Sequence, residues 1–185
     1  DKARVVYFGR DENIKRVTDA AEIEKTLAKF KISRPYVYYP AGSLVKRKNI
    51  PAAAQAFDKM RSRLGVNAEL VISGVGRFPP EAVAAIGECG LAEAIKIIRY
   101  ETDAEYSALL SGAEFVIYPS LYEGFGLPVL EAMACGAPVI ASSSSSLPEV
   151  AGDAALYCDP SDEESLAGAM ERLWSSGELK RELSE

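Results

Sequence analysis

Two glutamates that frame a glycine loop have the right type and spacing to bind hydroxyl groups. Glu123 and Glu131 are separated by seven residues, and Gly124-Phe125-Gly126 directly follows the first of them. A carboxylate only accepts hydrogen bonds, so its two oxygens are good partners for the paired hydroxyls of a sugar or a ribose. The competing interpretation is a solvated loop residue and a residue that compensates a helix dipole, and the two glutamates alone favour it.

A basic cluster offers the complementary chemistry. Lys46, Arg47 and Lys48 lie in a loop that starts after Gly42 and leads into a predicted helix. Charge-assisted hydrogen bonds from such side chains, together with the free N–H groups of a helix start, can hold a diphosphate. The alternative is an ordinary solvated basic loop, and these residues taken alone favour that alternative.

Both groups of residues are predicted to lie where a strand ends and a helix begins. Residues 115–118 form a short apolar run typical of a buried strand, and residues 127–134 carry helix formers with Pro128 in the first turn. A glycine and a proline end that helix before the next strand, at residues 139–140. Glu123 and its glycine loop are therefore expected at the carboxyl end of a strand, the edge at which open α/β sheets bind ligands.

Strands and helices alternate along the rest of the chain. Before the alternation begins, residues 5–8 form one short strand-like run, and residues 18–30 are predicted as a helix capped by Thr18. Ser146 and Glu149 are spaced as a capping box for a short helix. The regular alternation predicts an α/β fold with a doubly wound, Rossmann-like parallel sheet of about six strands. The predicted strands are 36–39, 69–73, 94–98, 115–118, 139–140 and 155–158, and the predicted helices are 49–64, 80–86, 103–110, 127–134, 147–150 and 161–174, followed by a helical or frayed tail.

Composition argues against several classes of protein and of site. The net charge of −6 argues against general nucleic-acid binding, and no apolar run approaches the roughly 20 residues of a membrane span. Cys89, Cys135 and Cys158 are expected to be reduced, buried thiols of a cytosolic protein. The chain has no histidine, which excludes a Ser-His-Asp triad and the usual zinc sites, and no Asp-x-Asp pair that could hold a metal–diphosphate. Any diphosphate would therefore be neutralised by Lys, Arg and backbone N–H groups.

Residues 123–139 carry a motif that changes the weight of these alternatives. Their sequence, Glu-Gly-Phe-Gly-Leu-Pro-Val-Leu-Glu-Ala-Met-Ala-Cys-Gly-Ala-Pro-Val, resembles at every fixed position the donor-binding signature of the family 4, or group 1, glycosyltransferases. The resemblance extends from about Tyr36 to the end of the chain and implies the C-terminal half of a retaining enzyme of the GT-B type. On this basis we expect residues 1–33 to be an interdomain segment with a helix, residues 34–185 to be the nucleotide-sugar-binding domain, and the N-terminal acceptor domain to be absent.

The resemblance also implies roles for individual residues. Glu131 is expected to accept hydrogen bonds from the ribose hydroxyls, and Glu123 is expected to hold the donor sugar. Arg47 and Lys48 are expected to neutralise the diphosphate as charge develops on the leaving group. The implied catalytic residues are Lys48, Arg47 and Glu123, and the implied substrate-binding residues are Gly42, Gly74, Tyr100, Gly124, Phe125, Gly126, Leu127 and Glu131, with no metal ligand.

Three further loops border the predicted site. Gly74-Val75-Gly76 lacks the third glycine of the dinucleotide fingerprint, which disfavours an NAD-dependent oxidoreductase. Gly74 is instead expected to give a close backbone approach beside the pocket. Tyr100 follows the third predicted strand, where the resembled family borders the nucleotide base. The serine run at residues 142–146 matches a family loop that lies near the donor pocket.

The function implied by the resemblance is the transfer of a sugar, with mannose as one candidate, from a GDP- or UDP-linked donor to an acceptor hydroxyl in glycan, lipopolysaccharide or glycolipid synthesis. No cofactor or metal is expected. The expected partners are the nucleotide sugar and the acceptor domain of the same enzyme, in the cytoplasm, with any contact to the inner face of the membrane made through the missing half. The alternative is a free-standing nucleotide-sugar-binding or regulatory module that has lost transfer activity.

Overall fold

A sheet of parallel strands organises the chain, seen in a computed structural model that describes residue 4 and residues 6–75, 80–88, 90–91 and 93–185. The elements are α1 (Ala20–Phe30), β1 (Tyr36–Ser43), the 3₁₀ helix η1 (Lys46–Lys48), α2 (Ile50–Leu64), β2 (Glu69–Val75), α3 (Pro80–Glu88), β3 (Ile95–Ile98), α4 (Asp103–Gly112), β4 (Phe115–Tyr118), α5 (Leu127–Ala134), β5 (Val139–Ser142), α6 (Leu147–Ala151), β6 (Leu156–Cys158), α7 (Glu163–Ser175) and α8 (Gly177–Glu182).

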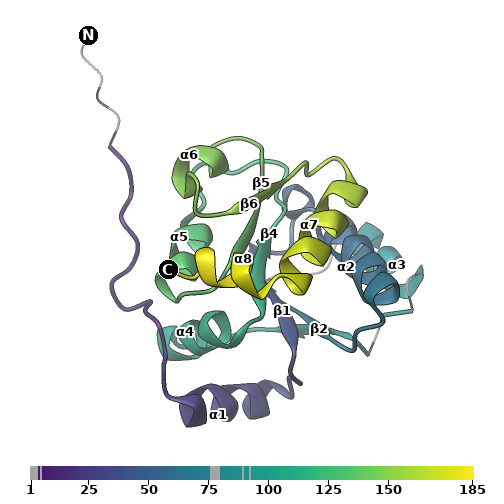
Figure 1. Ribbon diagram of the computed structural model, residues 1–185, viewed down its shortest axis with the longest axis horizontal. Coiled ribbons are helices and arrows are strands. Elements are labelled where there is room, and N and C mark those ends of the chain that lie inside the picture. The colour runs from purple at the N-terminus through teal and green to yellow at the C-terminus, as the bar shows by residue number, and fades with distance from the viewer. Residues whose placement is uncertain (1–3, 5, 76–79, 89, 92) are drawn as a thin grey trace.

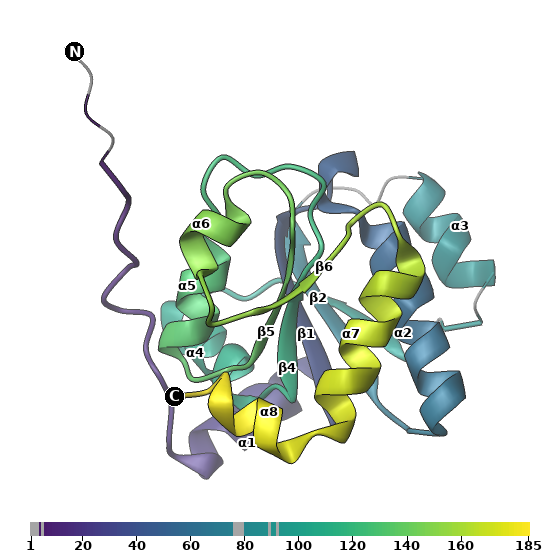
Figure 2. The same cartoon turned by 45° about the horizontal axis from the view of Figure 1, so that its top comes forward.

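The six strands lie in the order β3-β2-β1-β4-β5-β6, and every pair is parallel. Helices cover both faces of this sheet: α1, α4 and α5 lie on one side, and α2, α3 and α7 lie on the other (Figures 1 and 2). The two layers of helices confirm the predicted doubly wound α/β fold. The strand order reverses between β1 and β4, which is the topological switch point of the sheet.

The central strands are buried on both faces. Every residue of β4 and β5 is buried, as are the first six residues of β1. Strands covered on both faces have continuous apolar runs instead of alternation, which is what the sequence shows at these positions. Cys135 and Cys158 are free, buried thiols, as predicted, whereas Cys89 lies outside the described residues.

The elements around the glycine loop have the predicted bounds, but β1 and β2 are longer than expected. β4 and α5 begin and end where the sequence predicted. The ladder between β1 and β2 continues to the pair Ser43 and Val75, past a register shift between Pro40 and Gly42. Pairing with a parallel neighbour therefore keeps Pro40 and Gly42 in the strand, although both residue types usually end one.

Two predictions near the N-terminus were wrong. The described residues of the predicted strand, 6–8, form no strand; they belong to an extended segment that runs past the helices without joining the sheet (Figures 1 and 2). Val5 lies outside the described residues. Thr18 does not cap α1, because the carboxylate of Asp19 accepts a hydrogen bond from the N–H of Ala21 at 2.9 Å. A carboxylate at this position also interacts favourably with the helix dipole.

None of the helices in the described ranges combines the length and the apolar composition needed to cross a membrane.

Candidate functional site

The loops that follow β1 and β4 meet at the switch point of the sheet. β1 leads into η1 and α2, and β4 leads through the Glu123 loop into α5. The N–H of Leu121 donates to the carbonyl of Arg47 at 2.8 Å, and the side-chain amide of Asn49 donates to the carbonyl of Pro119 at 3.1 Å. These bonds fix the two loops to each other at the carboxyl edge of the sheet, where open α/β sheets bind ligands.

Lys48, Arg47 and Glu123 form one ion-paired group between these loops. Lys48 Nζ lies 2.7 Å from Glu123 Oε1, and Arg47 donates to Glu123 Oε2 at 2.8 Å. Lys48 Nζ also donates to the hydroxyl of Tyr118 at 2.7 Å. The side chains of Lys48 and Glu123 are 6% and 9% exposed, whereas that of Arg47 is 46% exposed. The structure thus brings together the three charged residues predicted from the sequence, and Arg47 is the one that faces solvent.

Burial and pairing act in opposite directions on the pKa values of this group. Burial lowers the pKa of Lys48 below its usual value, and the hydrogen bond to Glu123 offsets only part of that effect. Burial alone would raise the pKa of Glu123, but the hydrogen bond and charge of Lys48, together with the charge of Arg47, bring that pKa below its usual value. Two positive charges therefore face one negative charge, and the net positive charge that is left suits a further anion.

The glycine loop is held from behind by serines. Ser145 Oγ accepts from the N–H of Glu123 at 3.0 Å. The hydroxyl of Ser146 donates toward the carbonyls of Glu123 and Phe125, at 3.1 Å and 2.9 Å. The predicted capping box is therefore wrong: Ser146 precedes α6, but its side chain makes no hydrogen bond to that helix. Its backbone is helical, with φ −80° and ψ −11°, whereas a residue that caps a helix with its side chain is usually extended. The serine run acts here as a support for the loop.

Gly126 is the residue at which the loop packs most closely against its support. Its φ of +106° lies in a region that disfavours other residues, and a Cβ there would lie 2.4 Å from Leu147 Cδ2 of α6. Gly124 differs, because a Cβ added there would meet nothing within 4 Å. The loop therefore requires a glycine at one of its two glycine positions for reasons of packing and backbone conformation.

A pocket of about 400 Å³ opens in front of the ion-paired group. It is also lined by Tyr118 and by Phe8, neither of which was predicted as a site residue. Tyr118 could have been found from its place at the last position of a strand that ends at the site. Phe8 gave no such signal, because its contact, a ring centroid 5.6 Å from that of Phe125, joins distant segments. The predicted residues that line this pocket are Gly42, Arg47, Lys48, Glu123, Phe125, Gly126 and Leu127, while Gly124 lies in the loop but does not line it.

A second, smaller pocket of about 210 Å³ adjoins the first through Gly42. Its lining includes two of the predicted site residues, Gly74 and Tyr100, together with Val75 and Arg99. A Cβ on Gly74 would lie 3.0 Å from a methyl group of Leu44, so the close backbone approach is with the protein itself. The other predicted glycine of this loop, Gly76, lies outside the described residues.

Glu131 is set apart from the Lys48 group and makes a different contact. Its Oε2 accepts a hydrogen bond from the hydroxyl of Tyr106 on α4 at 2.9 Å. Burial raises the pKa of Glu131 above its usual value, the bond from Tyr106 lowers it, and the charges of Asp11 and Asp103 raise it further. Glu131 lines neither of the two pockets. Of the two predicted glutamates, only Glu123 pairs with Lys48 and Arg47 within the part of the chain that the structure describes.

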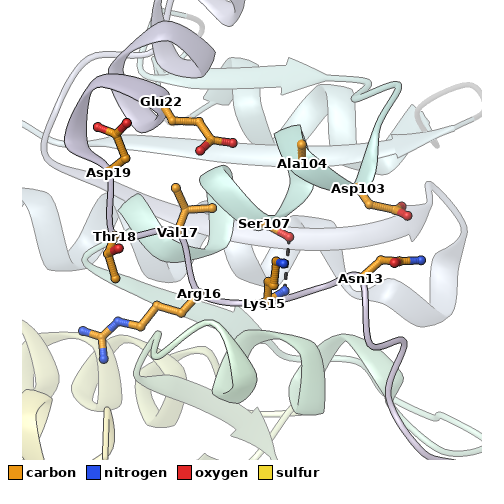
Figure 3. A pocket seen from close by; sticks show the side chains of 10 residues that line it. All are labelled: Asn13, Lys15, Arg16, Val17, Thr18, Asp19, Glu22, Asp103, Ala104 and Ser107. Atoms are coloured by element: carbon orange, nitrogen blue, oxygen red, sulfur yellow. Dashed lines mark hydrogen bonds between the residues drawn. The ribbon is translucent and has the colours of Figure 1, made fainter.

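Another pocket, of about 480 Å³, lies elsewhere, between residues 13–19, α1 and α4 (Figure 3). In its lining, the N–H of Lys15 donates to Ser107 Oγ at 3.3 Å (Figure 3). The side chain of Arg16 points away from the acidic side chains of Asp19 and Glu22 (Figure 3). It contains none of the predicted site residues. Within the described part of the chain, no three His, Cys, Asp or Glu side chains are grouped so that they could hold a metal ion.

Comparison with known proteins identifies relatives of this chain. A family model described as "Glycosyl transferases group 1" matches residues 8–185. The chain is 37% identical over 149 residues to the O-antigen chain mannosyltransferase B of Escherichia coli, covering 80% of this chain and 39% of that protein. It is 34% identical over 148 residues to the MMP α-(1→4)-mannosyltransferase of Mycolicibacterium hassiacum, covering 78% of this chain and 36% of that protein. The chain thus spans less than half the length of these relatives.

The fold is also found among solved structures. The structure of Anabaena HepE in complex with UDP and glucose superposes with a TM-score of 0.85 at 20% identity, covering 98% of this chain and 50% of that one. At this identity the likeness establishes a shared fold.

Proposed function

Because the chain belongs to the group 1 glycosyltransferases, we propose that it is the nucleotide-sugar-binding domain of a retaining glycosyltransferase. The observation that carries the proposal is the ion-paired group of Lys48, Arg47 and Glu123, which lines a pocket at the switch point of the sheet. A diphosphate is the anion that fits there, because the pocket combines net positive charge with the start of α5, whose free N–H groups and dipole favour phosphate.

In this proposal Lys48 and Arg47 stabilise the charge that builds on the leaving diphosphate. Charged donors fixed before the reaction need no reorganisation when the charge develops, and this makes them effective catalysts. Lys48 is buried and held by Glu123 and Tyr118, so it is preorganised. The more exposed Arg47 is available to follow the phosphate. Glu123 directs its carboxylate toward hydroxyls of the donor sugar.

The donor is proposed to be a GDP- or UDP-linked sugar, with mannose as the first candidate. The two sequence relatives described above are mannosyltransferases by name, which supports mannose. The HepE structure, described as a complex with UDP and glucose, supports a nucleotide-sugar donor. No metal or cofactor takes part in this proposal, because Lys and Arg neutralise the diphosphate. As part of the same proposal the domain works in the cytoplasm, and the acceptor, a growing glycan, lipopolysaccharide or glycolipid, is held by a further domain.

Calorimetric titration with GDP and UDP in the presence of EDTA tests this proposal. Lys48→Ala should weaken binding of the preferred nucleotide by about 1.5–3 kcal/mol, the range for a hydrogen bond to a charged group. Lys46→Ala is the matched control, because Lys46 lies in the same 3₁₀ turn but is exposed and does not line the pocket. Equal affinity of the two variants for the nucleotide would contradict the role of Lys48. Nucleotide binding by the wild-type chain that EDTA abolishes and Mg²⁺ restores would contradict metal independence.

A further inference from the structure

Tyr106 contacts two residues of the proposed nucleotide site, Glu131 and Tyr100, which were predicted from separate stretches of the sequence. It lies on α4, is 4% exposed, and donates its hydroxyl hydrogen to Glu131 Oε2 at 2.9 Å. The ring of Tyr100 stacks on the ring of Tyr106, with the two centroids 4.6 Å apart and an angle of 11° between the planes. One side chain therefore contacts both the predicted ribose carboxylate and an aromatic wall of the smaller pocket.

The ring of Tyr106 is itself fixed by the sheet. Tyr38 of β1 packs against it edge-on, with centroids 6.3 Å apart and planes 63° apart. Tyr38 is fully buried, and its hydroxyl lies 2.6 Å from Ser73 Oγ of β2. Because the contacts run from β2 through β1 to α4, the hydroxyl of Tyr106 has a defined position relative to the carboxyl ends of these strands.

We propose that Tyr106 is a positioning residue for the nucleoside end of the donor. Its hydroxyl orients the carboxylate of Glu131 toward the ribose hydroxyls, and its ring supports Tyr100, which forms a wall for the base. This inference rests on the proposed function, because it takes the ligand to be a nucleotide. The hydrogen bond from Tyr106 goes to Oε2 of Glu131. The second oxygen, Oε1, accepts no hydrogen bond within the described part of the chain, so it can accept one from a ribose hydroxyl.

The same bond affects the charge of the carboxylate. Burial raises the pKa of Glu131 and is the largest influence, while the hydrogen bond from Tyr106 favours the ionised form and lowers the pKa. Removing the bond therefore raises the pKa, so that the carboxylate is neutralised at a higher pH. The titratable groups that face Glu131 are Asp11 of the N-terminal segment, Tyr38 of β1, Tyr100 before α4, Asp103 and Tyr106 of α4, and Cys135 after α5.

The experiment compares the wild-type chain with Tyr106→Phe, using GDP and UDP as probes from about pH 8 to about pH 5.5. Tyr106→Phe keeps the ring and removes only the hydrogen bond. At about pH 8 the affinity of Tyr106→Phe for the nucleotide should be about threefold lower than that of wild type. At about pH 5.5 the ratio of the wild-type affinity to the variant affinity should grow to about tenfold or more. The titration of the nucleotide phosphates is common to both proteins and cancels in the ratio. Inorganic pyrophosphate, which has no ribose, should bind both proteins equally.

Tyr36→Phe is the matched control. The hydroxyl of Tyr36 is also buried and donates to a carbonyl of α4, that of Leu109 at 2.8 Å, but it does not touch Glu131. An affinity ratio for Tyr106→Phe that stays constant with pH, or a loss that Tyr36→Phe shares, would mean a merely structural role and overturn the inference. Binding of neither nucleotide by the wild-type chain would overturn the proposed function and this inference with it. Nucleotide binding by wild type with a constant ratio would overturn the inference alone.

Discussion

At the scale of single residues, the site depends on one carboxylate shared between two cations. Glu123 keeps Lys48 charged against the effect of burial, since burial lowers the pKa of the lysine and the carboxylate raises it. A buried charge that loses its partner is costly, so the ion pair with Glu123 favours the cationic form of Lys48. Glu123 therefore has two roles in our proposal: it preorganises the diphosphate-binding lysine, and it accepts from the donor sugar.

Glu123→Gln should separate these two roles. The amide keeps the size of the side chain and one acceptor oxygen for Lys48 but removes the charge, so a bound sugar loses a charged acceptor. For the diphosphate, the loss of a negative charge from the site offsets the weaker support of the Lys48 cation. We expect the affinity for a nucleotide sugar to fall about tenfold and that for the matching nucleoside diphosphate to change by less than about threefold. Titration calorimetry with the two ligands measures both numbers.

The control for this substitution is Glu114→Gln. Glu114 forms a 2.6 Å ion pair with Lys180, and neither residue lines the site pockets. If Glu123→Gln loses the nucleoside diphosphate and the nucleotide sugar to the same extent, the division of roles is wrong.

At the scale of elements, the site depends on how tightly the glycine loop packs against α6. Gly126→Ala would add a Cβ 2.4 Å from Leu147 Cδ2 at a φ of +106°. We expect the free energy of unfolding to fall by about 1–3 kcal/mol, as for other strained backbone positions. Because the start of α5 would shift as well, nucleotide affinity should also fall. Urea unfolding measures the first effect.

Gly124→Ala is the matched variant for that experiment. Its Cβ would meet nothing within 4 Å, and its φ is not in the left-handed region. Its free energy of unfolding should change by less than about 1 kcal/mol. Equal losses in the two variants would show that loop flexibility, and not the contact with α6, decides the stability.

The elements that the sequence predicted best are those with strong local signals at both ends. The bounds of β4 and α5 were predicted correctly, because proline and glycine residues mark their ends in the sequence. β1 and β2 were predicted too short, because proline and glycine occur inside them and only the neighbouring strand keeps them paired. Thr18 and Ser146 were both predicted as caps from local spacing. At α1 the adjacent Asp19 makes the capping bond instead. At α6 the backbone of Ser146 is helical, and its hydroxyl donates to the glycine loop.

The candidate site was predictable in its members but not in its contacts. Arg47, Lys48 and Glu123 could be chosen because parallel strands bring their carboxyl ends to one edge, together with the family resemblance. That Lys48 pairs with Glu123 depends on how two loops 75 residues apart pack, and this is not a pattern in the chain. The contact between Tyr106 and Glu131 joins two helices, so no local spacing indicates it.

At the scale of the whole molecule, the site is one edge of one sheet. The pocket in front of Lys48 and Glu123 is lined by residues at the carboxyl ends of β1 and β4 and by the loops that follow these strands. The side chain of Arg47 in this pocket remains 46% exposed. Water that reaches charged groups raises the local dielectric constant and weakens every charge interaction in the site. In the function that we propose, a further domain that holds the acceptor would cover this edge and exclude that water.

We therefore expect this chain alone to bind a sugar nucleotide without transferring the sugar. Transfer needs an acceptor hydroxyl held about 3–3.5 Å from the reacting carbon, and such positioning can contribute roughly 7–11 kcal/mol to catalysis. In our proposal the chain supplies the donor-side groups, namely Lys48 and Arg47 for the diphosphate, Glu131 for the ribose and Glu123 for the sugar. Closure of a second domain over the edge would supply both the position and the exclusion of water.

An end-point assay for free nucleoside diphosphate measures this directly, first with the chain alone and then with an acceptor domain encoded upstream added or fused. Release that depends on the acceptor should occur only in the second case. Lys48→Ala in the fused protein is the control for a reaction at this site, since it should abolish most of that release. Sustained, acceptor-dependent release by the chain alone would show that one sheet edge positions both substrates, and that the second domain is not needed for transfer.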